Sequence, residues 1–157
     1  MNIFNNILAQ NTIKQKCING DSYIIEKSGK RESVKNKNGV FDKLGKERGK
    51  ECEHFYITNQ DEFSRIKNEL VNSIFSETRI KELSKNKSSK ILIACLCNQN
   101  GEIKAVDFIS LNTDIISLIE IKNLEDALLK MKINVNCHSC PDTKYFLFNF
   151  AIFFDRL

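Results

Sequence analysis

The chain has 157 residues, of which 28% are charged and 41% are hydrophobic, and its formal net charge is +4. These proportions are typical of a globular protein and exclude a disordered chain, and the length suits one domain or one domain with a small appendage. No stretch approaches the roughly 18 consecutive apolar residues of a transmembrane helix, so we expect no integral membrane span.

Residues 1–10, MNIFNNILAQ, end in Leu-Ala-Gln, which is similar to the small-residue end of a secretory signal peptide. A charged start and a full apolar core do not precede it. We therefore expect either that the coding sequence begins upstream and residues 1–10 are a signal-peptide remnant, or that they form a native N-terminal segment.

The N-terminal region, residues 11–58, is predicted to hold a β-hairpin and loops. Asn19-Gly20-Asp21 is a turn signal between Ile13 and Tyr23-Ile24-Ile25, and residues 52–58 are a short strand candidate. Between them, Glu26 to Lys50 lacks apolar periodicity, so we expect strand ends and loop there.

The same region is basic: Lys27 to Lys50 holds nine basic residues against three acidic ones. A charge run of this kind usually marks a solvated loop. The alternative is a surface that binds nucleic acid or another anion.

The best helical pattern runs from Asn59 to about Phe75, with apolar residues at three- and four-residue spacing. Asn59 is the expected N-cap. A shorter helix is expected from Glu77 to Leu83.

The organising element is the β-hairpin expected from Ile91 to Ser110. Asn100-Gly101 lies between two apolar runs and predicts a type I′ turn with a positive φ at Gly101. The first strand is apolar on both faces, which predicts a central position. The second alternates Val106 and Phe108 with Asp107 and Ile109 and holds polar residues, which favours an edge position.

Two elements follow the hairpin. Asn123 is the expected cap of a helix from Leu124 to Met131, whereas Ser117 to Ile121 is consistent with either helix or extended chain. Tyr145 to Phe154 is aromatic-rich and predicts a long closing strand whose core face carries Phe146, Phe148, Phe150, Ile152 and Phe154.

The order of these elements predicts an α+β fold with an antiparallel ββαβ sheet, in which the strands of residues 59–157 lie in the order second, first, third and the helices pack on one face. The closing strand is then an edge. Because a long, apolar edge invites strand pairing, we expect it to be covered by Asn11 to Ile25 or by a symmetric dimer contact.

The strand, Asn-Gly-Glu turn, strand, Leu-Glu-x-Ala-Leu helix and Phe-rich strand resemble the C-terminal domain of TonB. More specifically, they resemble small secreted proteins of Bacteroides-type bacteria with a divergent copy of that domain. The matching segments are Ser76–Leu83, Ile91–Ser110, Leu124–Lys132 and Tyr145–Phe154. The resemblance implies a periplasmic or surface-associated protein whose sheet edge accepts a partner strand, and it implies no catalytic residue.

Six cysteines suit an extracytoplasmic protein or a metal site. Cys95, Cys97, Cys137 and Cys140 have the number of thiolates that zinc needs, but Cys95 and Cys97 in an apolar strand are by default core residues. His54 and His138 have no paired serine or carboxylate at a known catalytic spacing.

We therefore predict no catalytic, cofactor-binding or metal site. The expected function is that of a non-enzymatic extracytoplasmic binding or envelope-associated module, in the periplasm or secreted, with a protein partner or a second copy at a sheet edge and no nucleic-acid partner. The alternative is a cytoplasmic nucleic-acid or anion binder that uses Lys27 to Lys50.

Overall fold

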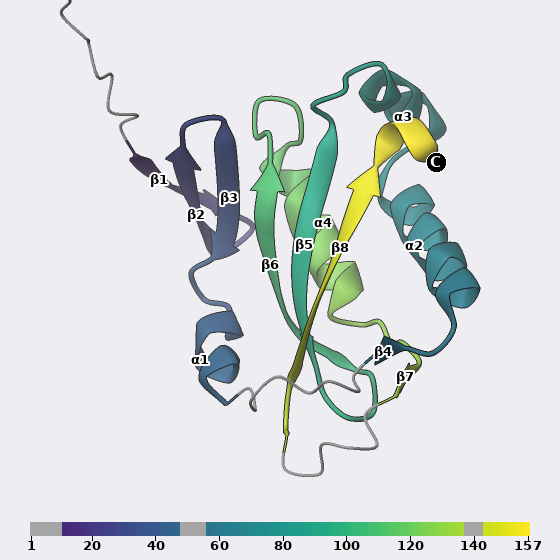
Figure 1. The fold of residues 1–157 in the computed structure, drawn as a ribbon. Coiled ribbons are helices and arrows are strands. Elements are labelled where there is room, and N and C mark those ends of the chain that lie inside the picture. The colour runs from purple at the N-terminus through teal and green to yellow at the C-terminus, as the bar shows by residue number, and fades with distance from the viewer. Residues whose placement is uncertain (1–10, 48–55, 137–142) are drawn as a thin grey trace, which may run out of the picture.

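The computed structural model describes residues 11–47, 56–136 and 143–157 (Figure 1). Its elements, in chain order, are β1 (Thr12–Ile18), β2 (Asp21–Ser28), β3 (Arg31–Asn36), α1 (Phe41–Lys46), β4 (Tyr56–Ile57), α2 (Gln60–Ile74), α3 (Glu77–Ser84), β5 (Lys90–Cys97), β6 (Ile103–Leu111), α4 (Leu118–Leu128), β7 (Val135–Asn136), β8 (Phe146–Phe153) and a 3-10 turn, η1 (Phe154–Arg156).

The main sheet has six antiparallel strands in the order β1-β2-β3-β6-β5-β8, and β4 pairs with β7 in a second, two-stranded sheet. The predicted α+β class and the order of β6, β5 and β8 are confirmed. β3 pairs with β6, so the N-terminal strands and the C-terminal half build one sheet.

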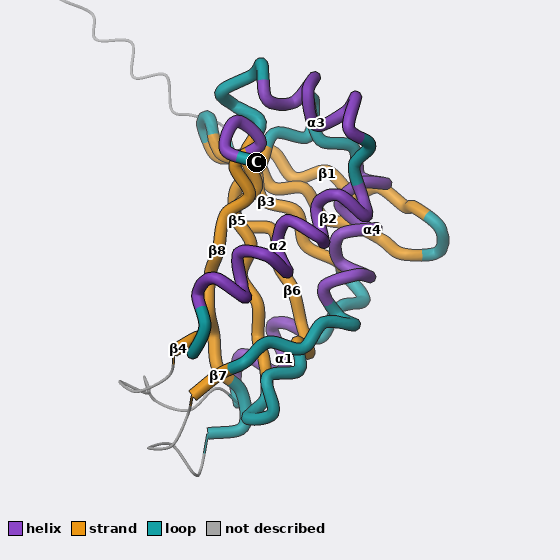
Figure 2. Tube along the Cα trace, turned by 90° about the vertical axis from the view of Figure 1, so that its right-hand side faces the viewer, coloured by secondary structure: helices purple, strands orange, loops and turns teal. Residues whose placement is uncertain are grey.

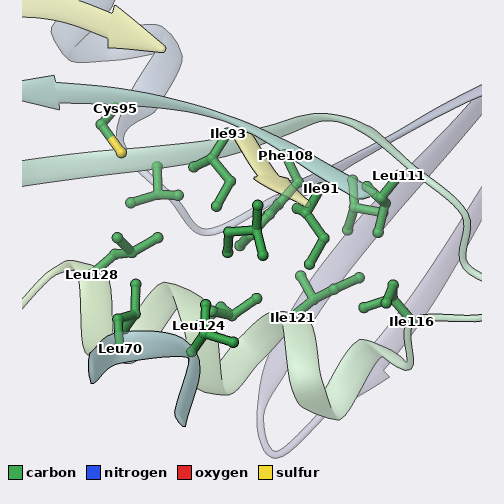
Figure 3. Packing of buried hydrophobic residues seen from close by; sticks show 14 of the residues in the cluster. Leu70, Ile91, Ile93, Cys95, Phe108, Leu111, Ile116, Ile121, Leu124 and Leu128 are labelled. Carbon is green, nitrogen blue, oxygen red and sulfur yellow. The ribbon is translucent and has the colours of Figure 1, made fainter. Parts of the chain in front are cut away.

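α2 and α4 cover one face of the sheet, and the end formed by β1 and β2 bends towards α4 (Figure 2). Between sheet and helices lies the core, in which Ile91, Ile93 and Phe108 meet Leu124 and its neighbours (Figure 3). Phe75 and Phe154 close its α3 end, with ring centroids 5.1 Å apart and edge-to-face. We call the opposite face of the sheet, which points away from α2 and α4, the outer face.

The predicted long helix is confirmed as α2, and the N-cap is Asn59, whose side chain accepts a hydrogen bond from the N–H of Glu62 at 2.9 Å. The shorter helix is confirmed as α3, capped by Ser76. On β8 the predicted core face is confirmed: Phe146, Ile152 and Phe154 are buried, while Phe148 and Phe150 pack against the core and stay partly exposed.

Strand ends and loop are the prediction between Glu26 and Lys50. In the described part of that range the strand end is confirmed, since β2 runs to Ser28, but the loop is wrong, because β3 and α1 follow. Strand β3 shows little apolar pattern because Glu32 occupies a buried position beside Val34. Its carboxylate accepts hydrogen bonds from Lys27 at 2.9 Å and from Thr113 at 2.7 Å. A paired glutamate thus stands where an apolar residue would have revealed the strand.

The edge position predicted for the second hairpin strand is also wrong, since β6 pairs with β3 as well as β5. The type I′ turn lies instead in the first hairpin, where Asn19 and Gly20 have φ of 48° and 87°. At the second turn only Gly101 has positive φ, at 77°, and its N–H donates to the carbonyl of Asn98 at 3.0 Å. This is the geometry of a three-residue loop that ends in a left-handed glycine.

The helix predicted from Leu124 begins earlier, at Leu118, so Asn123 lies inside α4 and is not its cap. Ser117 is the cap, in a capping box with Glu120. Arg79 of α3 donates to the Glu120 carboxylate at 2.7 Å and to the carbonyl of Ile115 at 2.6 Å. These bonds join α3 to the start of α4.

Candidate functional site

A groove of about 450 Å³ crosses the outer face at the end of the sheet where β5 begins. β3, β5, β6 and β8 all contribute to it. Its lining comprises Arg31, Lys90, Ile91, Leu92, Ile109, Ser110, Ala151 and Phe153. Most of the lining side chains are apolar and two are cationic, which suits a ligand with an apolar part and a negative charge.

A β-bulge in β6 shapes this groove. Leu92 pairs with Ser110 while Ile93 pairs with Phe108, so Ile109 is an extra residue opposite β5. The register of β6 with β3 shifts over the same residues, between the pairs Glu32–Leu111 and Val34–Phe108. The core residues Phe108 and Leu111 are therefore separated by two residues instead of one, so Ile109, which is 38% exposed, and Ser110 both lie on the outer face. Bulges commonly redirect a side chain in this way beside functional sites.

The charge of the groove is one-sided. Arg31 and Lys90 are exposed, and within the described parts of the chain neither makes an ion pair. No Asp or Glu is among the lining residues, and a third cation lies close by, because the guanidinium of Arg156 sits 4.7 Å from the centre of the Phe153 ring. An anion in the groove would meet attraction without repulsion from its walls.

Beside the groove, β8 is the last strand of the sheet, and no described strand pairs with its edge on the side away from β5. The segment Asn11 to Ile25, predicted to cover this edge, forms β1 and most of β2, and β1 is the opposite edge of the sheet. That part of the prediction is wrong because β3 extends the sheet from β6, on the side away from β8. A symmetric dimer contact at β8 stays a prediction.

A second hollow, of about 310 Å³, lies beside Glu125 of α4. The Glu125 carboxylate accepts a hydrogen bond from the Tyr23 hydroxyl at 2.6 Å and two from the Asn36 amide at 3.2 Å. Burial raises the pKa of Glu125, and these two donors partly oppose that rise. Because both carboxylate oxygens accept bonds from β2 and β3, this cluster fastens the N-terminal strands to α4 and is a structural network.

Asp107 is a buried carboxylate on the outer face, next to α1. It lies 3.6 Å from Lys35, which also pairs with Asp42 of α1 at 2.9 Å. Burial raises the pKa of Asp107 to about 6, although Lys35 acts in the opposite direction. The three groups hold α1 against the sheet, apart from the groove.

The residues weighed as metal ligands do not come together in the described chain. Cys95 and Cys97 are buried on the core face of β5, as Figure 3 shows for Cys95, whereas Cys137, Cys140, His54 and His138 lie outside the described residues. Residues 11–47, 56–136 and 143–157 contain no cluster of His, Cys, Asp and Glu that could hold a metal ion. Burial raises the pKa of the Cys95 thiol, as expected for a core cysteine.

The basic stretch from Lys27 is divided between several elements. Lys27 pairs with Glu32 and Lys35 with Asp42 and Asp107, whereas Arg31 lines the groove. Over residues 27–47, the part of the stretch that the structure describes, the charges therefore do not form one continuous run. Sequence reasoning did not single out the groove, because its apolar residues come from three strands that are distant along the chain.

One solved structure with a similar fold is that of a DUF5043 family protein from Bacteroides uniformis, with a TM-score of 0.64 and 15% sequence identity over 94% of each chain. At this identity the similarity shows the shared fold alone. The organism of that protein is a Bacteroides, which is the type of bacterium that the sequence resemblance names. No protein-family model matches the chain, and a search of the curated proteins finds no match. No helix in the described parts of the chain is long and apolar enough to cross a membrane.

Proposed function

We propose that the protein is a non-enzymatic binding module that acts outside the cytoplasm, and that an extended segment of a protein partner pairs with β8. The observation that carries this proposal is the end position of β8 in the sheet. An edge strand has a row of backbone N–H and C=O groups that face no neighbouring strand, and peptides bind such edges by adding a strand.

The two edges of the sheet differ in a way that favours β8. Strand β1 carries Lys14 and Lys16 and is almost wholly exposed, and lysines of this kind protect an edge from unwanted pairing. Strand β8 has the sequence FLFNFAIF, with Asn149 as its single polar residue. A partner that pairs with β8 would therefore also gain apolar contacts.

The chemistry of the groove supports a binding role. Its ionisable side chains are the cations Arg31 and Lys90, so its lining offers no carboxylate or thiol as general base or nucleophile. A location in the periplasm or at the cell surface is supported by the resemblance to the TonB C-terminal domain of four segments: Ser76–Leu83, Ile91–Ser110, Leu124–Lys132 and Tyr145–Phe154.

The alternative, a nucleic-acid or anion binder using Lys27 to Lys50, ranks lower because Lys27 and Lys35 are already ion-paired. Retention on heparin that falls with salt would support it. We expect no such retention at physiological ionic strength.

The proposal is tested by selecting extended peptides from a displayed random library and mapping the bound peptide by amide hydrogen exchange. We expect new protection within residues 146–153. The double variant Leu147→Lys, Asn149→Lys should weaken binding, whereas Gln15→Lys, in the middle of β1, should not. Protection on β1 alone, or equal binding by all variants, would contradict the proposal.

Fractionation of the producing cells tests the location, and recovery of the protein from the cytoplasm alone would contradict the proposed location.

A further inference from the structure

We propose that the groove on the outer face binds a long-chain aliphatic carboxylate, such as a free fatty acid. The hydrocarbon chain would lie over Leu92, Ile109 and Phe153, and the carboxylate would pair with Arg31 and Lys90. This inference goes beyond partner binding at the β8 edge and does not depend on it.

The floor of the groove favours a hydrocarbon chain over a peptide. Strands β5 and β6 are interior strands, paired on both sides, so most of their backbone groups, apart from those at the bulge, are engaged in the sheet. Among the side chains of the floor only Ser110 is polar. A peptide backbone laid across this floor would lose its hydrogen bonds to water and find few replacements, a cost that a hydrocarbon chain does not carry.

The two cationic side chains of the groove favour a ligand with one anionic group. Arg31 and Lys90 have no ion-pair partner in the described chain, and the lining holds no acidic residue. A carboxylate satisfies this arrangement because a guanidinium binds its two oxygens in a bidentate manner and an ammonium adds a further charge-assisted bond. A neutral alcohol of the same length would gain only the apolar part.

The bulge widens the surface that β6 presents to the groove. A strand without the extra residue would place one residue between Phe108 and Leu111, whereas β6 places two, Ile109 and Ser110, on the outer face. The first of them, Ile109, is 38% exposed and adds apolar surface to the groove. A bound hydrocarbon chain would cover this side chain and remove its surface from water.

The inference is tested with the whole protein by calorimetric titration with dodecanoate below its micelle concentration. Dodecanol and dodecyltrimethylammonium are the uncharged and cationic comparisons. We expect one site for dodecanoate, about tenfold weaker binding of dodecanol and no binding of the cation, since a charge-assisted bond contributes about 1.5 kcal/mol or more.

Variants identify the site. Arg31→Gln and Lys90→Gln should each weaken dodecanoate binding about tenfold, and Ile109→Ser should do the same by removing apolar contact. Lys130→Gln and Ile119→Ser are matched controls at exposed positions of or beside α4 and should bind as the wild type does.

Three results would overturn the inference: no binding of dodecanoate, equal binding by all five variants, or equal affinity for dodecanol. Binding to phosphatidylglycerol vesicles that needs Arg31 and Lys90, without binding of dodecanoate, would assign the groove to a membrane surface instead. A dimer that Ile109→Ser dissociates would assign it to self-association. Because Arg31 lies on β3, Arg31→Gln should leave peptide binding at β8 unchanged, so the two proposals fail separately.

Discussion

Alanine variants at Gly101 and Gly20 can separate two causes of lost stability, namely a positive φ and a close contact of the added Cβ with the backbone. Gly101 has φ of 77°, and a Cβ added to it would overlap the carbonyl oxygen of Ile133 and lie 3.0 Å from its carbonyl carbon. Gly20 has a similar φ of 87° in the first hairpin, but nothing lies within 4 Å of an added Cβ. Alanine at Gly20 thus tests backbone strain alone, and alanine at Gly101 tests strain and overlap together.

The two costs follow from the structure. A left-handed alanine costs about 1–2 kcal/mol, which is the whole expected effect of Gly20→Ala. In Gly101→Ala the backbone at Ile133 must also move away, which disrupts the 2.9 Å hydrogen bond from the N–H of Ile133 to the Gly101 carbonyl and loosens a side chain that is 2% exposed. The lost bond adds about 1 kcal/mol and the partial exposure about 1–2 kcal/mol, for a total of about 3–5 kcal/mol.

The assay is urea unfolding followed by circular dichroism. With an m-value of about 2 kcal/mol/M, Gly20→Ala should lower the midpoint by about 0.5–1 M and Gly101→Ala by about 1.5–2.5 M. Unequal m-values would require the free energies to be compared instead of the midpoints. Equal losses of stability in the two variants would refute the reasoning, because they would mean that the contact with Ile133 carries no cost.

Three further predictions use the same unfolding assay. Asp107→Asn should raise the free energy of unfolding by about 1–2 kcal/mol at pH 8, by little near pH 4 and by nothing well below that. The reason is that the pKa of Asp107 is about 6 when folded and 3.8 in the unfolded reference, so ionisation destabilises the fold as the pH rises through this interval. A gain that is constant with pH would contradict this cause. Phe154→Ala should lower the free energy of unfolding by about 3–5 kcal/mol, and Phe150→Ala, at a partly exposed position, by about 2–3 kcal/mol. A larger loss in Phe150→Ala than in Phe154→Ala would contradict the burial of Phe154. Ser117→Ala should cost about 1 kcal/mol by removing the capping box of α4, and an unchanged midpoint would argue against that cap.

The elements predicted well were those whose side-chain period and end signals agree. In α2 the buried residues Phe63, Leu70 and Val71 recur at helical spacing behind an Asn59 cap, and β5 and β8 are nearly continuous apolar runs of strand length. The start of α4 was misplaced although Ser117-x-x-Glu120 is a capping-box signature. Asn123, the cap expected from the sequence, competes with it, and the choice between the two depends on tertiary contacts such as the bond from Arg79 to Glu120.

Strand β3 could not be predicted because its place in the sheet is stabilised by a charged residue. Burial alone would raise the pKa of Glu32, but hydrogen bonds from Lys27 and Thr113 outweigh it and lower the pKa to about 2. Thr113 is far from Glu32 along the chain, so nothing near RESVKN shows that this carboxylate is satisfied inside the protein. A position of this type is read as solvent-exposed, and with it the strand is read as a loop.

The groove depends on this unpredicted strand. Once β3 pairs with β6, β6 becomes an interior strand whose backbone is engaged on both sides, and its remaining freedom lies in where its side chains point. The bulge uses that freedom to place two successive side chains, Ile109 and Ser110, on the outer face, and β3 also supplies Arg31 to the same groove. Alternation along β6 alone shows neither effect, because it places Ile109 on the outer face but Ser110 on the core face. The register against two neighbouring strands reveals the extra residue, and the candidate site therefore comes from the sheet and not from a sequence motif.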